Sequence, residues 1–174
     1  MKNIERQIII SALFSALIIS FCVSANAQTN PSFEVLADEA LTKVVPTSFY
    51  FAGQSAQTQA RNTAAAKIGK DRFVVVGLVD TSGYSTEISG KYEGFFITDS
   101  PVRIGNKTLG TGAYGFGFSA NGNVNIFDLS SKQILSAATK SDGEMKRPRP
   151  LMMMNDAKGV RLYKGKNYVL IAPK

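Results

Sequence analysis

Histidine and tryptophan are absent from this 174-residue sequence, and cysteine occurs once, at Cys22. Without histidine the chain cannot form a Ser-His-Asp triad, a Cys-His dyad or a His-ligated zinc or iron site. Cys22 lies in a segment that we expect to be removed, which excludes disulfides, thiolate nucleophiles and thiolate metal sites. Carboxylates, serine with lysine, tyrosine and arginine are the groups left for chemistry.

Nucleotide and metal sites are not predicted either. No glycine-rich segment is followed by Lys-Ser or Lys-Thr at the spacing of a phosphate-binding loop. The glycine-rich run 110–117 has the pattern of a strand and does not open a helix, so we reject a dinucleotide site there. Asp80, Asp99 and Asp128 are too scattered to predict a calcium site. We expect no cofactor and no metal.

The first 27 residues have the composition of a secretory signal peptide. A basic start precedes apolar residues 8–23, and an Ala-x-Ala pattern ends at Ala27. An uncleaved anchor is the alternative, although a largely apolar stretch of 16 residues is short for a membrane span of about 20. Lipidation at Cys22 is a third option, but Phe21 stands where a small residue is expected. We expect cleavage after Ala27 and an exported protein, periplasmic or extracellular, with no transmembrane segment.

Removal of the signal peptide leaves 147 residues (174 minus 27), the usual size of one domain. In residues 28–46, Asn30 and Pro31 have the pattern of a helix start, and Pro46 ends the segment. Apolar residues recur between them at three- and four-residue spacing. This pattern predicts one amphipathic helix over residues 31–44, followed by a single β domain over residues 47–174.

Period-two patterns dominate the β domain. Tyr114, Phe116 and Phe118 alternate with Ala, Gly and Ser, then Asn121-Gly122 has the composition of a tight turn before a return strand at 124–129. We interpret the aromatic face as core packing, with a pocket for an apolar molecule as the alternative. Residues 54–67 alternate as a polar edge strand, although Ala64-Ala65-Ala66 would also suit a helical turn.

Further short strands are predicted between turn residues. The nearly continuous apolar run 73–79 has the pattern of a strand covered on both faces. The spacing predicts an all-β antiparallel meander, as a small barrel or a two-sheet sandwich with the N-terminal helix added. The remaining predicted strands are 47–51, 91–98, 102–104, 107–109, 132–138, 151–154, 159–163 and 167–171.

Positive charge is concentrated at the C-terminal end. Residues 28–139 carry nine Lys or Arg and nine Asp or Glu, whereas residues 140–174 carry nine against three, an excess of +6. This asymmetry favours a surface for an anionic partner, although solvated turn residues would give the same count. Arg147 and Arg149, in a proline-extended run, and Arg161 are the candidate binding residues, because arginine forks suit anionic groups.

The loop 80–86 is the second candidate binding site. Asp80, Ser82 and Tyr84 could hydrogen-bond a polar ligand, and functional residues are often carried on loops above a rigid scaffold. The alternative is that Asp80 and Ser82 only stabilise a turn through Gly83. For catalysis, the carboxylates to consider are those of Asp80, Glu93, Asp99 and Asp128. A pairing of Ser82 or Ser85 with Lys91 lacks a Ser-x-x-Lys motif.

Several blocks together resemble a family of small exported bacterial β-proteins whose activity is not established. The blocks are residues 49–55, 77–85 with 91–92, 112–118, 147–151 and 161–165. The resemblance covers most of the mature chain and implies that these blocks belong to one domain. It supplies no catalytic or binding residues.

The leading hypothesis from the sequence is a non-catalytic, exported binding or envelope-associated protein. Its expected partners are anionic envelope polymers or lipid head groups, since no nucleic-acid motif is present. One alternative is a carboxylate-dependent hydrolase of an envelope or extracellular polysaccharide. Another is a carrier for a small apolar ligand. The sequence leaves the oligomeric state open.

Overall fold

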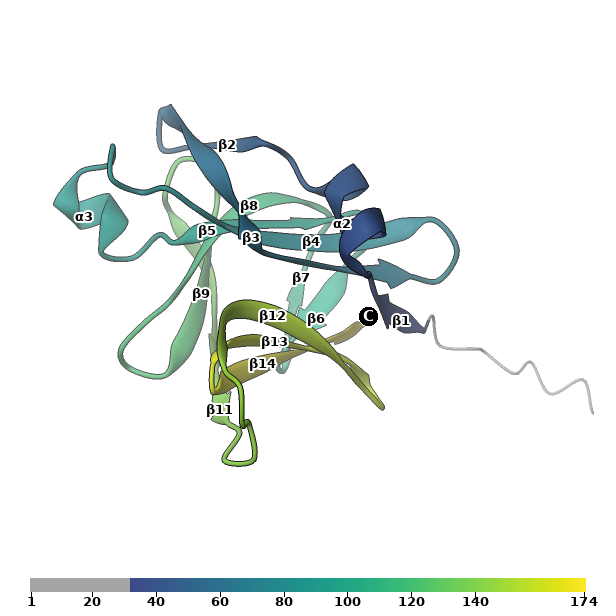
Figure 1. The fold of residues 1–174 in the computed structure, drawn as a ribbon. Helices are drawn as coiled ribbons and strands as arrows, with labels where there is room; N and C mark the ends of the chain where they lie inside the picture. The colour runs from purple at the N-terminus through teal and green to yellow at the C-terminus, as the bar shows by residue number, and fades with distance from the viewer. Residues whose placement is uncertain (1–31) are drawn as a thin grey trace, which may run out of the picture. The chain divides into compact units, whose positions relative to one another are not determined.

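The computed structural model describes residues 32–174 (Figure 1), which are mostly β-strand. The signal-peptide prediction falls outside these described residues. Two antiparallel sheets are present, and strand pairing within residues 32–174 does not close either of them into a barrel. The all-β prediction is confirmed, and of its two alternatives the two-sheet sandwich fits.

The first sheet contains eight strands. Their order is β1 (Phe33–Val35), β3 (Gln54–Ile68), β4 (Arg72–Val79), β5 (Gly94–Thr98), β8 (Gly112–Phe118), β9 (Asn123–Phe127) and β10 (Gln133–Ala138), and β2 (Ser48–Phe51) pairs with β3. The second sheet runs β12 (Arg149–Asp156), β13 (Gly159–Gly165), β14 (Asn167–Pro173), β6 (Val102–Ile104) and β7 (Lys107–Leu109), and β11 (Lys140–Ser141) pairs with β14.

Both sheets contribute to one apolar core. Val76, Phe116 and Ile126 of the first sheet and Leu162 and Ile171 of the second belong to the same buried cluster. Between β5 and β8 the meander is interrupted, because the chain leaves the first sheet after β5 to form the β6–β7 hairpin and returns at β8. The two sheets are therefore connected by chain crossover as well as by the core.

The first sheet is also covered on its other face. Phe51 of β2 stacks on Tyr92 with ring centroids 4.0 Å apart, and Phe49 packs on Phe95 at 5.3 Å. The segment around the short helix α3 (Thr86–Ser89) closes this second cluster. Strand β4 alternates between the two cores, with Val74 in one and Val75 in the other. The prediction of a strand buried on both faces is confirmed.

The glycine–aromatic hairpin is also confirmed, as β8 and β9. Phe116 is fully buried in the core between the sheets. The glycine face lies against other parts of the chain. A Cβ added at Gly115 would lie 2.3 Å from the Phe51 ring, and one at Gly117 would lie 2.1 Å from the carbonyl oxygen of Lys91. Glycine is needed because these neighbours approach the strand closely.

The helix predicted over residues 31–44 is not confirmed. Phe33–Val35 forms strand β1, which pairs with β3 through Phe33 and Ile68, and the helix α2 occupies only Asp38–Val44. No residue of α2 is buried. The edge of β3 offers backbone hydrogen bonds to Phe33–Val35, and this long-range pairing overrides the local helical period. None of the helices in residues 32–174 has the length and apolar character needed to cross a membrane.

Strand β3 is interrupted by a wide bulge. Thr58 is opposite Val79, but Thr63 is opposite Gly77, so five steps on β3 match two on β4. The bulge, residues 59–62, is held by side chains: Gln59 Nε2 donates to the Val79 carbonyl (2.9 Å) and Asn62 Nδ2 to Gln59 Oε1 (2.8 Å). Before the bulge, residues 54–57 pair with β2 and Thr58 with β4, and after it β3 pairs with both β1 and β4.

Candidate functional site

The structure separates the three candidate residues of the loop 80–86. Asp80 and Ser82 are exposed, and Asp80 Oδ1 accepts a hydrogen bond from the Ser82 backbone N–H at 3.0 Å. That bond lowers the pKa of Asp80. Tyr84 is buried, its hydroxyl donates to the Gln54 carbonyl at 3.0 Å, and its ring packs edge-on against Tyr92. Asp80 and Ser82 stabilise a turn, and Tyr84 contributes to the core, so the three do not converge on one site.

The four carboxylates considered for hydrolysis also accept backbone hydrogen bonds. Asp99 accepts from Phe73 N at 3.2 Å, and Glu93 accepts from Phe118 N at 2.9 Å while its other oxygen pairs with Lys164. Asp128 Oδ1 accepts from Ser130 and Lys132, and the Ser130 hydroxyl is the main cause of its lowered pKa. Within residues 32–174, no three His, Cys, Asp or Glu side chains are placed to hold a metal ion.

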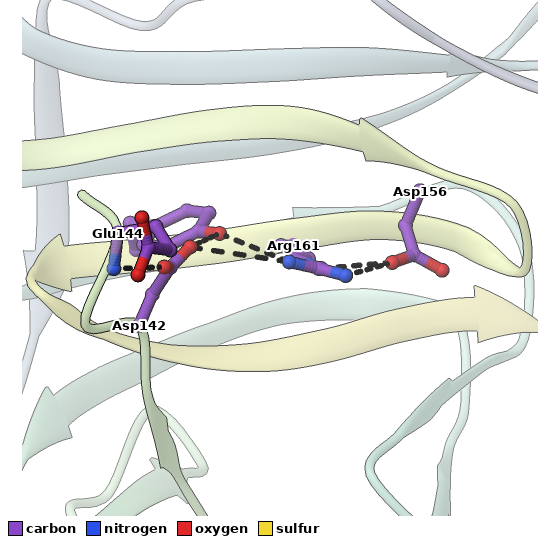
Figure 2. Close-up of polar contacts among 5 residues, drawn as sticks. Asp142, Glu144, Asp156 and Arg161 are labelled. Atoms are coloured by element: carbon purple, nitrogen blue, oxygen red, sulfur yellow. Dashed lines mark hydrogen bonds and ion pairs between the residues drawn. The ribbon is translucent and has the colours of Figure 1, made fainter.

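Arg161 of β13 lies between two carboxylates (Figure 2). Its Nε and one terminal nitrogen each lie 2.8 Å from Asp156 Oδ2, and the other terminal nitrogen is 3.9 Å from Asp142 Oδ2. The Tyr163 hydroxyl donates to the same Asp142 oxygen at 2.8 Å. The guanidinium also lies 4.8 Å above the centre of the Tyr168 ring.

This network neutralises Arg161 within the fold. Hydrogen bonds with the Tyr163 hydroxyl and the Asp156 carboxylate raise the pKa of Arg161. The Lys158 backbone N–H, together with Arg161, lowers the pKa of Asp156. The network forms part of the wall of a pocket of about 550 Å³, to which Lys140 also contributes. An external anion would have to compete with two carboxylates for Arg161, so this arginine is better placed to order β13 than to bind a ligand.

Arg147 and Arg149 are in a different situation. Both are exposed, at the entry to β12, and neither forms a salt bridge with any residue of the range 32–174. The neighbouring Lys146 is also exposed and unpaired in that range. These cations are therefore available to an external anion.

Arg149 lies at a groove that we call the α2–β3–β12 groove. The groove has a volume of about 740 Å³ and is formed by α2 and its flanking residues, the bulged part of β3 and the start of β12. Leu36, Leu41, Leu151 and Met153 supply apolar surface. Its charged side chains are those of Asp38, Arg61 and Arg149.

The sequence did not single out Arg61. It lies in the alternating polar stretch that predicts an edge strand, and nothing in that pattern shows the bulge that places it beside β12. Bulges of this kind often redirect a side chain next to a functional site. The only local sign of a site at Arg61 is the number of Gln, Thr, Asn and Arg residues in one strand, and this sign is weak.

A glycine motif lies at the start of β8. The glycines at 110, 112 and 115 have the Gly-x-Gly-x-x-Gly spacing of a dinucleotide fingerprint. That fingerprint requires a strand–turn–helix unit, in which the helix N-terminus holds the pyrophosphate. Here the glycines enter β8, and the next element is the antiparallel strand β9. The spacing does not form a nucleotide site.

Searches against protein-family models, curated proteins and solved structures find no match for this chain. The family resemblance of residues 49–55 and 112–118 stays a prediction. The function therefore has to be inferred from the groove and from the unpaired cations beside it.

Proposed function

We propose that this chain is a non-catalytic, exported binding protein that holds an anionic partner through the cations at the start of β12. The observation that supports the proposal is the contrast within the basic C-terminal region. Arg161 and Lys164 are paired with carboxylates, whereas Lys146, Arg147 and Arg149 are exposed and, among residues 32–174, without a salt bridge.

The three cations lie within residues 146–149. Lys146 and Arg147 are in a bend before β12, and Arg149 is the first residue of that strand. Each arginine presents a planar fork that matches the oxygens of a phosphate or carboxylate group. Exposed charges of this kind bind weakly one at a time, and their combined effect falls as salt shortens the screening length from about 10 Å at 0.1 M to about 3 Å at 1 M. Binding is therefore expected to depend steeply on salt.

Export is the second part of the proposal. It is supported by the signal-peptide pattern of residues 1–27. Expression of the full chain in a bacterial host, followed by fractionation and N-terminal mass analysis, tests it. The expected product begins at Gln28 and is found outside the cytoplasm. An uncleaved product in the cytoplasm would contradict the export proposal.

The binding proposal is tested with the mature chain on two kinds of anionic surface, a heparin resin and vesicles containing half phosphatidylglycerol. Vesicles of phosphatidylcholine alone are the uncharged comparison. We expect retention at low salt on at least one anionic surface and release at about 1 M salt. Retention on heparin alone identifies a polymer partner, and stronger retention on anionic vesicles identifies lipid head groups.

Two triple variants locate the binding site. Lys146, Arg147 and Arg149 are changed to Gln in one, and the exposed Lys70, Lys107 and Lys132 in the other, so both lose the same charge. Only the first is expected to lose retention at low salt. Equal behaviour of the two triple variants, or no retention of the wild-type protein at low salt, would overturn the proposal.

A further inference from the structure

We infer that the α2–β3–β12 groove binds a single-chain anionic amphiphile, with its hydrocarbon chain on the apolar surface and its phosphate or carboxylate group at Arg61 and Arg149. This inference deepens the proposed function and rests on it for the role of Arg149. It names the chemical class of the anionic partner. It also moves the apolar-ligand site away from the aromatic face of β8, where Phe116 is fully buried in the core.

The apolar surface of the groove is incompletely covered by the protein. Leu36 and Leu41 are only half-buried, and helix α2 has no buried residue. Across the groove, Leu151 and Met153 of β12 are nearly fully buried but still contribute to its lining. The volume of about 740 Å³ lies within the range of about 300–1,000 Å³ that is usual for ligand pockets. A hydrocarbon chain in the groove would remove this remaining apolar surface from water.

The charges of the groove favour an anion over a neutral or cationic ligand. Arg61 comes from the bulge of β3 and Arg149 from the start of β12, and in the range 32–174 neither has a salt-bridge partner. Asp38 is the one acidic side chain of the lining, so the two arginines leave an excess of one positive charge. A phosphate or carboxylate group would supply the missing counter-charge.

The Thr58 hydroxyl is a further polar group at this site. It is buried in the groove wall, at the point where the bulge begins, and has no hydrogen-bond partner among the described residues. Buried hydroxyls are normally paired, so an orphan beside a groove marks a position where a ligand atom can complete the bonding. The bulge thus brings two features together, a displaced arginine and an unsatisfied hydroxyl.

The experiment measures binding of alkyl phosphates with six, eight, ten and twelve carbons to the mature chain by calorimetry, below their micelle concentrations. Each added methylene is expected to tighten binding about fourfold until the groove is full, the value for burying one methylene. Inorganic phosphate and octanol are the comparison ligands, since each carries one half of the amphiphile. Octanol is expected to bind at least about tenfold more weakly than octyl phosphate, because hydrogen bonds to a charged group are lost.

Variants separate the two halves of the site. Arg61→Gln with Arg149→Gln is expected to weaken octyl phosphate binding about tenfold or more while keeping the chain-length dependence. Lys107→Gln, which removes an exposed cation outside both the groove lining and the cations of residues 146–149, is the control and is expected to bind within about twofold of wild type. Ala60→Trp fills the groove from an exposed position and is expected to abolish the chain-length dependence. Thr42→Trp, on the α2 side, serves if Ala60→Trp does not fold.

The outcomes distinguish this inference from the proposed function. If the wild-type protein binds anionic surfaces but shows no gain with chain length, the amphiphile site is wrong and the proposed function stands. If octanol binds as well as octyl phosphate and no anionic surface retains the protein, the proposed function is wrong as well. Unchanged chain-length dependence in a folded groove-filling variant would also overturn the inference.

Discussion

Gly117→Ala tests whether the glycines of β8 are required by close packing. The added Cβ would lie 2.1 Å from the Lys91 carbonyl oxygen and 3.0 Å from its carbon. Both are backbone atoms, so no side-chain rotation can relieve the overlap. Either β8 or the segment around Lys91 has to move.

That segment is firmly held, which sets the size of the effect. Glu93 donates its backbone N–H to the Phe116 carbonyl at 2.9 Å, and the side chain of Tyr92 is fully buried. Moving Lys91 therefore disturbs a ladder bond and a packed ring. We expect a loss of about 3 kcal/mol in the free energy of unfolding, at the upper end of the overpacking range. For a domain of this size, that corresponds to a melting temperature lowered by about 10 °C.

The assay is urea unfolding followed by circular dichroism, with thermal melts as a second measurement. Gly110→Ala is the matched control, because the nearest atom to its added Cβ is the Tyr114 hydroxyl at 3.8 Å. It is expected to change stability by less than about 1 kcal/mol. If Gly117→Ala and Gly110→Ala are equally stable, close approach is not the reason for glycine in this strand.

Two pH-dependent predictions follow from the buried and paired groups. The pKa of Asp156 is lowered from 3.8, first by the Lys158 backbone N–H, so its stabilisation is present above pH 3.8 and lost as pH falls through the lower folded value. Asp156→Asn should therefore be less stable than wild type at pH 6, with the two urea-unfolding curves converging toward about pH 2; parallel curves would contradict this. Burial raises the pKa of Tyr92 from 10.0. Above pH 10 the Tyr92 hydroxyl therefore ionises in the unfolded chain while it stays neutral in the folded protein, and this difference lowers the free energy of unfolding. Tyr92→Phe should be at least as stable as wild type at pH 7, because the hydroxyl has no hydrogen-bond partner in residues 32–174, and its advantage should widen above pH 10; a constant difference would show that Tyr92 does not resist ionisation.

The fold was predicted well where local patterns decide it. The alternation in β8, the turn residues at 121–122 and the apolar run of β4 all formed the expected elements. The helix predicted over residues 31–44 was not predicted correctly, because Phe33–Val35 pairs with β3 as a strand. A residue pattern with a helical period cannot show that a strand edge will be free beside it.

The candidate site was predicted only in part. Composition pointed to Arg149 and Arg161 equally, but Asp156 and Asp142 neutralise Arg161, whereas Arg149 has no such partner within the described part of the chain. Arg61 was missed, because its place at the groove depends on a bulge opposite β4. Tyr84 was proposed as a ligand contact and is instead buried against Tyr92.

The sequence alone determined the strand class, the hairpins and the excess of Lys and Arg in residues 140–174. These are properties of residue type and near-neighbour spacing, which act through local sterics and backbone conformation. Three features became visible only in the tertiary structure. They are the close contacts that require glycine in β8, the cations without a salt bridge among the described residues, and the position of the groove. Each of these depends on contacts between distant segments, such as Lys91 against Gly117 and β12 beside the bulge of β3. Pairing energies between such segments exceed local preferences, so only the folded chain shows them.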